Sequence, residues 1–194
     1  MSTPPDTSQD DHTHFWAHTD EGKEVRFVDP RTFGFVAVFT PEELESDSMA
    51  LLGRDAWHDL PTPDELAETL RNRTAPIKSL LLDQRIIAGL GNIYTDEILS
   101  LACVDPHREG GSLSRAEIES LHDAVGPVLD AAIVAGGTSL EDLAYLLPDG
   151  RAGEMLQQLQ VYGMEGEPCP RCGTEITRRV LRGRSTHFCP HCQR

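Results

Sequence analysis

Four cysteines near the carboxy-terminal end of the sequence have the spacing of a metal site. Cys169 and Cys172 form one C-x-x-C pair, and Cys189 and Cys192 form a second pair after 16 intervening residues. Each pair can turn two thiolate sulfurs toward one point, and the residues between the pairs suffice for a hairpin. The pattern predicts a tetrahedral four-thiolate site that holds one structural Zn²⁺.

The hairpin expected between these pairs carries four arginines, at positions 178, 179, 182 and 184. A zinc-bound hairpin with only a structural role does not require four arginines. A solvated basic face is the alternative interpretation. The concentration of charge favours contact with DNA or RNA, because phosphate oxygens are the usual partners of clustered guanidinium groups.

A second group of residues has the features of an anion site. Pro76-Ile-Lys78 is followed by Gly89-Leu-Gly91 and by Asn92, which opens a helix. Glycines let the backbone approach a partner closely, and the start of a helix presents free N–H groups. Glycines before a helix are often only a turn. The position of this segment in a basic part of the sequence favours phosphate binding by Lys78 and Asn92.

A third group is the bend Asp29-Pro30-Arg31-Thr32-Phe33-Gly34. It would hold Arg31 and Phe33 two residues apart on one face. A plain β-turn with Phe33 in the core is one interpretation. The other is an arginine and an aromatic wedge that enter a duplex, as enzymes that extrude a base require.

The net charge of −15 argues by itself against a nucleic-acid partner, but the charge is unevenly distributed. Residues 71–93 hold 4 basic and 1 acidic side chains, and residues 168–194 hold 6 and 1, in a chain that is otherwise strongly acidic. Because salt screens charges beyond about 8–10 Å, phosphate binding depends on the local face rather than on the total. Two basic islands can therefore still bind DNA.

The pattern of elements indicates an α+β protein. Residues 15–39 read as two or three strands, which is few for an independent sheet. Helices are expected over 63–73, 76–83, 92–101, 114–137 and 139–146, with Thr62 and Ser114 as N-caps. Strand and turn character returns from residue 157. No apolar run approaches the roughly 20 residues of a membrane span, and the odd cysteine count fits a reducing, cytoplasmic setting.

Three stretches, taken in order, resemble the formamidopyrimidine-DNA glycosylase and endonuclease VIII family of bacterial repair enzymes. They are FVDPRTFG (27–34), PIKSLLLDQRIIAGLGNIYTDEIL (76–99) and GEPCPRCGTEITRRVLRGRSTHFCPHCQR (166–194). The DPRTFG bend and the four thiolates are closer to formamidopyrimidine-DNA glycosylase. The polar and acidic residues 1–14 indicate a disordered lead. The resemblance, which begins at about Phe15, implies part of an N-terminal β-sandwich (15–58), a helix-two-turn-helix domain (59–153) and a zinc-finger β-hairpin (154–194).

The resemblance also implies roles for individual residues. Asn92 and Arg184 would hold the phosphates beside a lesion, and Lys78 would approach the damaged nucleotide. Arg31 and Phe33 would fill the gap left by the everted base, and Tyr162 would lie near the lesion pocket. The partner would be damaged double-stranded DNA, bound by a monomer associated with the nucleoid. The family removes oxidised purines, such as 8-oxoguanine and formamidopyrimidines, and cleaves the abasic site.

One part of the family pattern has no counterpart in the sequence. The family's nucleophile is the amine of an N-terminal proline that is followed by glutamate, whereas this chain begins Met1-Ser2-Thr3-Pro4-Pro5. We therefore assign no catalytic residue and expect these 194 residues alone not to act as a glycosylase and lyase. Two interpretations stay open: part of an ordinary enzyme, or a non-catalytic, zinc-dependent module that binds damaged DNA. A structural zinc ribbon is a third, but it gives no reason for the Arg31–Phe33 bend.

Overall fold

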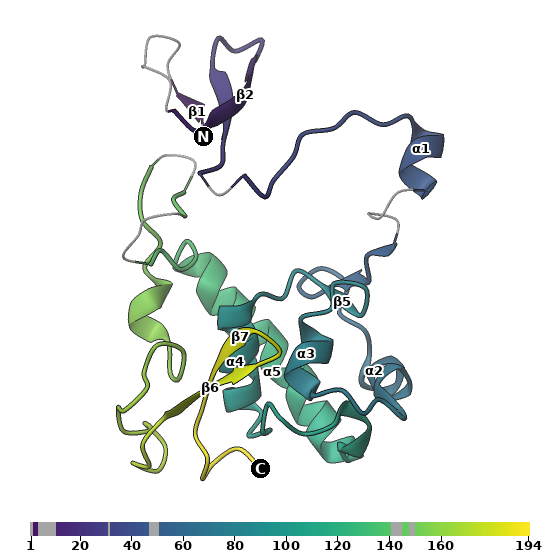
Figure 1. The fold of residues 1–194 in the computed structure, drawn as a ribbon, viewed down its shortest axis with the longest axis vertical. Coiled ribbons are helices and arrows are strands. Elements are labelled where there is room, and N and C mark those ends of the chain that lie inside the picture. Colours follow the sequence, from purple (N-terminus) through teal and green to yellow (C-terminus); the bar gives the residue numbers. More distant parts are fainter. Residues whose placement is uncertain (1, 4–10, 31, 47–50, 141–144, 148–149) are drawn as a thin grey trace.

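The computed structural model describes residues 2–3, 11–30, 32–46, 51–140, 145–147 and 150–194 (Figure 1). Its mixture of helices and short sheets confirms the predicted α+β class. The helices are α1 (Pro41–Ser46), α2 (Pro63–Leu70), α3 (Ile77–Leu81), α4 (Asn92–Leu101) and α5 (Arg115–Val134). The strands are β1 (Ser2–Thr3), β2 (Thr13–His18), β3 (Glu24–Val28), β4 (Arg54–Asp55), β5 (Ile87–Ala88), β6 (Thr177–Leu181) and β7 (Arg184–Phe188). The strands pair in the orders β1-β3-β2, β4-β5 and β6-β7.

Two helices begin at the N-caps that the sequence predicts, Thr62 and Ser114, and each N-cap forms a capping box. The Thr62 hydroxyl accepts a hydrogen bond from the backbone N–H of Glu65, whose carboxylate accepts from the backbone N–H of Thr62. Ser114 and Glu117 make the same reciprocal pair at the start of α5. Each box satisfies backbone donors that have no partner inside the helix. The helix expected over 139–146 falls largely on 141–144, outside the described residues.

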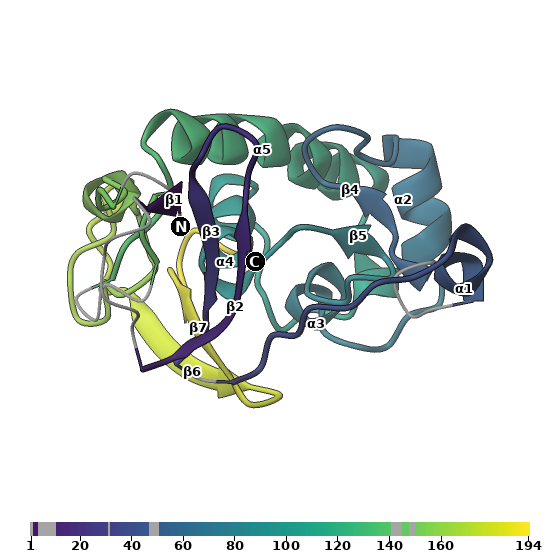
Figure 2. The ribbon, with the colours of Figure 1, turned by 90° about the horizontal axis from the view of Figure 1, so that it is seen from above.

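The helices share one apolar core, with α4 packed against α3 and α5 (Figure 2). Its members come from all of the helices between residues 63 and 134, and each large side chain contributes about 1.5–3 kcal/mol by its burial. Fully buried members of this core are Leu66, Leu70, Ile77, Leu81, Ile87, Leu90, Ile98, Leu99, Val104 and Leu121. This core fixes the start of α4 in space.

The connection from α3 to α4 is held by the side chain of Gln84. Its carbonyl oxygen accepts from the N–H of Gly89 at 2.8 Å, and its amide nitrogen donates to the carbonyl of Leu90 at 3.0 Å. Gly89 has a φ of +96°, which glycine adopts without the strain a side chain would add. The connection delivers the chain to Gly91, the N-cap of α4, and so presents Asn92 at the first position of the helix.

The N-terminal sheet β1-β3-β2 lies apart from the helices in Figure 1, on the long segment that carries α1. Phe15 pairs with Phe27 and Ala17 with Val25, so one face of the sheet is apolar. The strand expected around Val36–Phe39 is wrong, since residues 33–40 are irregular. Among the described residues no further strand pairs with this segment, and an isolated strand leaves its backbone groups without partners.

The β6-β7 hairpin turns at Arg182 and Gly183, whose φ angles are +46° and +80°. Two successive left-handed residues make a type I′ turn, which matches the right-handed twist of the flanking strands. The register pairs Leu181 with Arg184 directly beside the turn. Strand β7 packs against α4 (Figures 1 and 2). The hairpin is thereby brought to the same place as the start of α4.

Candidate nucleic-acid interface and zinc site

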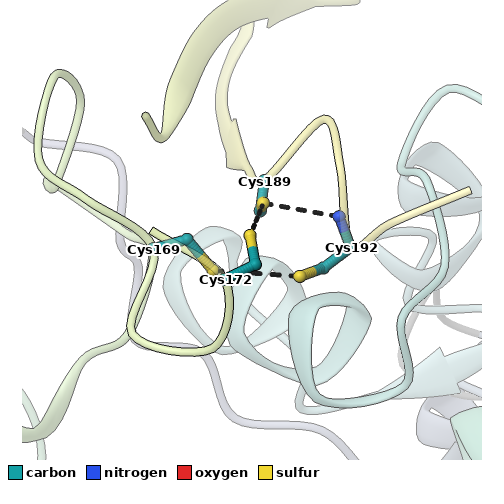
Figure 3. Close-up of side chains that lie close together, drawn as sticks. All are labelled: Cys169, Cys172, Cys189 and Cys192. Atoms are coloured by element: carbon teal, nitrogen blue, oxygen red, sulfur yellow. Dashed lines mark hydrogen bonds between the residues drawn. The ribbon is translucent and has the colours of Figure 1, made fainter. Parts of the chain in front are cut away.

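The four predicted cysteines converge on one point (Figure 3). Their sulfur atoms all lie within 4.8 Å of one another, with 4.0 Å between Cys169 and Cys192 and 3.6 Å between Cys172 and Cys189. Tetrahedral Zn–S bonds of about 2.3 Å place sulfurs about 3.8 Å apart, so the donor set fits Zn²⁺. The prediction of a structural zinc site at these residues is confirmed.

Local hydrogen bonds shape the first pair of cysteines. The backbone N–H of Gly173 donates to the carbonyl of Cys169 at 2.8 Å, and the φ of Gly173 is +76°. Hydrogen bonds from the Thr174 hydroxyl and from its backbone N–H lower the pKa of the Cys172 thiol to about 6. Burial raises the pKa of Cys189, and hydrogen bonding to Cys172 raises the pKa of Cys192 to about 12, so Cys172 loses its proton before these two thiols.

The second pair is tied to the helical domain through Gln193. Its side-chain oxygen accepts from the N–H of Cys189 at 2.9 Å, and its amide nitrogen donates to the carbonyl of Val104 at 2.9 Å. Gln193 is buried, so these bonds are shielded from water. The zinc site and the helices therefore form one connected structure.

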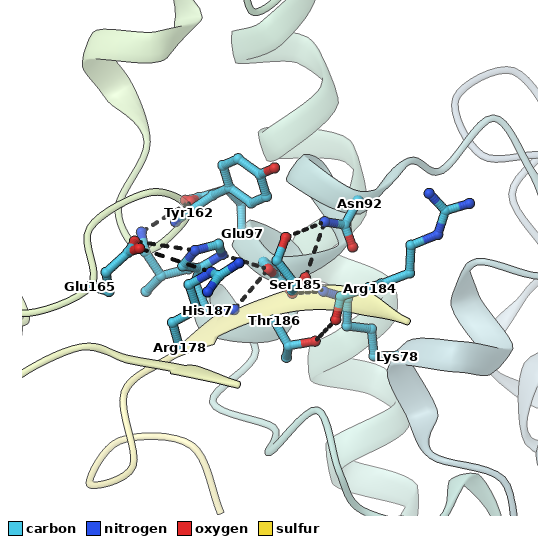
Figure 4. A network of polar contacts seen from close by, with 12 residues as sticks. Lys78, Asn92, Glu97, Tyr162, Glu165, Arg178, Arg184, Ser185, Thr186 and His187 are labelled. Atoms are coloured by element: carbon cyan, nitrogen blue, oxygen red, sulfur yellow. Dashed lines mark hydrogen bonds and ion pairs between the residues drawn. The ribbon is translucent and has the colours of Figure 1, made fainter. Parts of the chain in front are cut away.

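Two of the predicted DNA-binding residues meet at the carbonyl oxygen of Ser185 (Figure 4). Lys78 Nζ donates to this oxygen at 2.7 Å, and Asn92 Nδ2 donates to it at 3.0 Å. Asn92 Nδ2 also donates to Ser185 Oγ at 3.2 Å. Arg184 immediately precedes Ser185, is exposed, and opens strand β7. Lys78, Asn92 and Arg184, which are far apart in the sequence, are thus brought together.

Lys78 also forms a buried ion pair. Its Nζ lies 2.6 Å from Asp96 Oδ1, and the two side chains are 1% and 0% exposed. Burial lowers the pKa of Lys78, the carboxylate of Asp96 opposes that shift, and the charge of Arg184 lowers the pKa further. The ammonium group of Lys78 therefore faces protein atoms, and its contact with a nucleotide stays a prediction.

The carboxylate of Asp96 has a second partner in the hairpin. Its Oδ2 accepts from the backbone N–H of His187 at 2.9 Å and lies 3.4 Å from His187 Nδ1. The other ring nitrogen of His187 lies 3.3 Å from Glu165 Oε2. Tyr162 packs edge-on against the His187 ring, with centroids 4.7 Å apart (Figure 4). Tyr162 is thereby placed beside the same network.

Glu97 is a structural residue of this region that the sequence gave no reason to single out. Its carboxylate is buried and accepts from the backbone N–H groups of Gln160, Val161 and Tyr162 at 2.8, 3.0 and 2.9 Å. Burial raises the pKa of Glu97, and the three N–H donors lower it in part. A carboxylate that accepts hydrogen bonds from three consecutive backbone N–H groups fixes the conformation of the segment that carries Tyr162.

The bend predicted to enter the duplex is only partly described. Arg31 lies outside the described residues. Phe33 is 85% exposed, which is incompatible with the core-phenylalanine interpretation of the bend. The N–H of Gly34 donates to Asp29 Oδ2 at 2.6 Å and closes the bend around Phe33.

The arrangement is suited to an anion. Helix α4 starts at Asn92 with no side-chain cap, so the N–H groups of its first turn are available to an external acceptor. The helix dipole adds partial positive charge at this end, and Arg184 on the neighbouring strand adds a full one. A phosphate group has the charge and the acceptor geometry for such a position.

Among the described residues, no helix is long and apolar enough to cross a membrane.

Two family models match the chain. The formamidopyrimidine-DNA glycosylase H2TH domain matches residues 52–143. The zinc finger found in FPG and IleRS matches residues 166–194. The first match includes Lys78, Asn92 and Asp96, and the second includes the four cysteines and Arg184. The two matches therefore meet at the contacts described above.

Curated relatives are similar over nearly the whole chain. A formamidopyrimidine-DNA glycosylase from Rhizorhabdus wittichii is 46% identical over 94% of this chain and 67% of the relative. One from Gluconobacter oxydans is 44% identical over 100% of this chain and 68% of the relative. The chain thus spans about two thirds of the length of these relatives.

Solved structures agree with the sequence comparisons. The crystal structure of the MutM (Fpg) protein from Thermus thermophilus aligns with a TM-score of 0.87 at 38% identity, over 96% of this chain and 70% of that one. The Lactococcus lactis Fpg in complex with DNA that contains an abasic site aligns with a TM-score of 0.88 at 35% identity. That alignment covers 100% of this chain and 70% of the Lactococcus protein.

Proposed function

Because this chain belongs to the formamidopyrimidine-DNA glycosylase family, we propose that it binds damaged duplex DNA as a monomer in base excision repair. One observation carries the proposal. The start of helix α4 and the arginine-bearing end of the zinc hairpin are joined through Ser185, so Asn92 and Arg184 lie on neighbouring elements at one place. Two phosphate-binding groups at a fixed spacing suit a backbone of regularly spaced charges.

In this proposal the residues have separate roles. Asn92 and Arg184 bind the phosphates on either side of the lesion, and Lys78 approaches the damaged nucleotide. Arg31 and Phe33 enter the space that an everted base leaves, and the exposure of Phe33 supports this role. Tyr162 lies beside the damaged nucleotide. Most of the binding free energy comes from the phosphate contacts, and recognition of damage comes from the bend.

We further propose that these 194 residues bind damaged DNA without cleaving it. Covalent attack on an abasic sugar needs an unprotonated amine. The sequence has two lysines, Lys23 and Lys78. Lys78 is enclosed by Asp96 and Ser185, and exposed Lys23 lies at the β2–β3 turn, paired with Glu21 at 2.9 Å. Neither side chain has the setting of a nucleophile.

Fluorescence anisotropy tests the binding proposal. The zinc-loaded chain is titrated against a duplex that contains a tetrahydrofuran abasic-site analogue and against the matching intact duplex, over a range of salt concentrations. We expect tighter binding to the abasic duplex. Arg184→Ala should reduce the slope of log K against log [salt] by about 0.9, since it removes one phosphate contact. Equal affinity for both duplexes, or an unchanged slope, would contradict the proposal.

Borohydride trapping tests the proposal that these residues bind damaged DNA without cleaving it. The chain is incubated with a duplex that contains a natural abasic site, in the presence of sodium borohydride, which reduces any imine to a stable adduct. We expect strong binding but neither a covalent adduct nor strand cleavage. An adduct that depends on Lys78 or on the chain's terminal amine would show that these residues do react with the sugar.

A further inference from the structure

Helix α4 is attached to strand β7 at two points, one turn of the helix apart. Asn92 and Asp96 are four residues apart and so lie on one face of the helix, about 6 Å apart along its axis. Their backbone partners are the carbonyl of Ser185 and the N–H of His187, which belong to residues two apart in the strand. Helix and strand therefore fit in one register, and a shift of either breaks both contacts.

The backbone groups used here lie on one edge of β7. In a strand, the carbonyl of one residue and the N–H of the second residue after it point to the same side. Strand β6 pairs with β7 on the other side. The side chains of Lys78, Asn92 and Asp96 thus occupy the edge where a third strand would bind, and they satisfy its buried polar groups.

Asp96, on helix α4, contacts both Lys78 on helix α3 and the backbone of strand β7. Its Oδ1 pairs with Lys78 and its Oδ2 accepts from the hairpin backbone, while its side chain is fully buried. Replacing it with alanine would leave the His187 N–H without an acceptor and the Lys78 ammonium without its counter-ion, with only the Ser185 carbonyl still accepting from Lys78, in a site that excludes water. Removing one partner of a buried pair is costly for this reason.

When an anion is bound by Asn92, the attachment of strand β7 to helix α4 depends more on Asp96. Asn92 Nδ2 has two hydrogens, and its two acceptors are the carbonyl and the hydroxyl of Ser185. The other amide atom, Oδ1, is an acceptor and cannot bind phosphate. To donate to a phosphate, the Asn92 side chain must give up a bond to Ser185. The strand is then held in place by Asp96 and Lys78.

We propose that Asp96 is a positioning residue that sets the spacing between Asn92 and Arg184 without touching DNA. The proposal rests on the proposed function, in which these two residues bind phosphates. Arg184 directly precedes Ser185 at the start of β7, so a tilt of the strand edge moves Arg184 relative to the helix. Asp96 acts on affinity through Arg184, and its contribution disappears when Arg184 is absent.

A double-mutant cycle tests this inference by anisotropy, with the zinc-loaded chain and the tetrahydrofuran duplex. Asp96→Ala should weaken binding about tenfold in the wild-type background and less than about twofold in an Arg184→Ala background. Asp96→Asn retains an oxygen for the His187 N–H, so we expect a smaller loss. Asp123→Ala removes an exposed carboxylate from α5 and serves as the control, with unchanged affinity.

Zinc content and the cobalt(II) spectrum of each variant show whether the four-thiolate site is intact. Should Asp96→Ala not fold, Asp96→Asn carries the cycle alone. Equal losses in both backgrounds would overturn the inference, as would affinity within twofold of wild type for the Asp96 variants, or loss of the zinc site in both of them. These results differ from a failure of the proposed function, in which wild type binds both duplexes equally or Arg184→Ala alone has no effect.

Discussion

Glu97 gives a test of the link between helix α4 and the segment that carries Tyr162. Its carboxylate is 5% exposed and accepts three backbone N–H groups between residues 160 and 162, at 2.8 to 3.0 Å. Glu97→Ala removes all three acceptors at once. Each buried N–H left without a partner costs about 1 kcal/mol or more, so the free energy of unfolding should fall by about 3 kcal/mol.

A loss of about 3 kcal/mol corresponds to a decrease in Tm of about 6–12 °C for a chain of this size. Differential scanning calorimetry of the zinc-loaded chain measures it. Glu97→Gln should fall between wild type and Glu97→Ala. Its remaining oxygen can still accept from Val161 and Tyr162, but its amide nitrogen cannot accept from Gln160.

Glu119 provides a matched control on helix α5. It is half exposed and pairs with Arg115 at 2.7 Å on the surface, an arrangement that is worth less than about 1 kcal/mol. Glu119→Ala should therefore change the Tm by no more than about 4 °C. A Glu97→Ala variant as stable as this control would refute the reasoning, because it would mean that the three N–H groups find other acceptors without cost.

Three further predictions concern charge, metal and the bend. Hydrogen bonding to Arg108 lowers the pKa of Glu117 from 4.5 to about 2, so the stability it contributes is present above pH 4.5 and is lost as the pH falls toward 2. Urea unfolding of Glu117→Gln should show a weaker decline over that window. Chelation of zinc should abolish binding to the abasic duplex. The far-UV circular dichroism signal of the helices should stay largely intact, because the core of α2 to α5 contains no zinc ligand. Loss of the helical signal would contradict this prediction. Phe33→Ala should leave the Tm unchanged, because the side chain is 85% exposed. The same substitution should reduce the preference for the abasic over the intact duplex. An unchanged preference would argue against the role of Phe33 as a wedge.

Local signals in the sequence were sufficient for several parts of the structure. The spacing of the two C-x-x-C pairs predicted the zinc site, because each pair needs only its own turn to aim two sulfurs at one ion. Thr62 and Ser114 predicted the starts of two helices, because an N-cap contacts backbone groups only two or three positions further along the chain. Asn92 was placed at a helix start by the preceding glycines.

The strand expected around Val36–Phe39 failed for the opposite reason. β-branched and aromatic residues favour a strand, but a strand exists only where another strand accepts its hydrogen bonds. In the described part of the chain, β3 pairs with β1 and β2, and no strand pairs with residues 33–40. Composition could indicate the preference of this segment but not the presence of a partner.

The sequence by itself determined which residues could bind zinc and which could bind phosphate. Only the tertiary structure decided how they are joined. Ser185, Asp96 and Glu97 show no distinguishing pattern along the chain, and their roles depend on contacts with residues more than 60 positions away. The sequence predicted phosphate binding by Lys78, but folding places this side chain in a buried ion pair with Asp96. A polar side chain takes its role from the groups that surround it, and only packing brings those groups together.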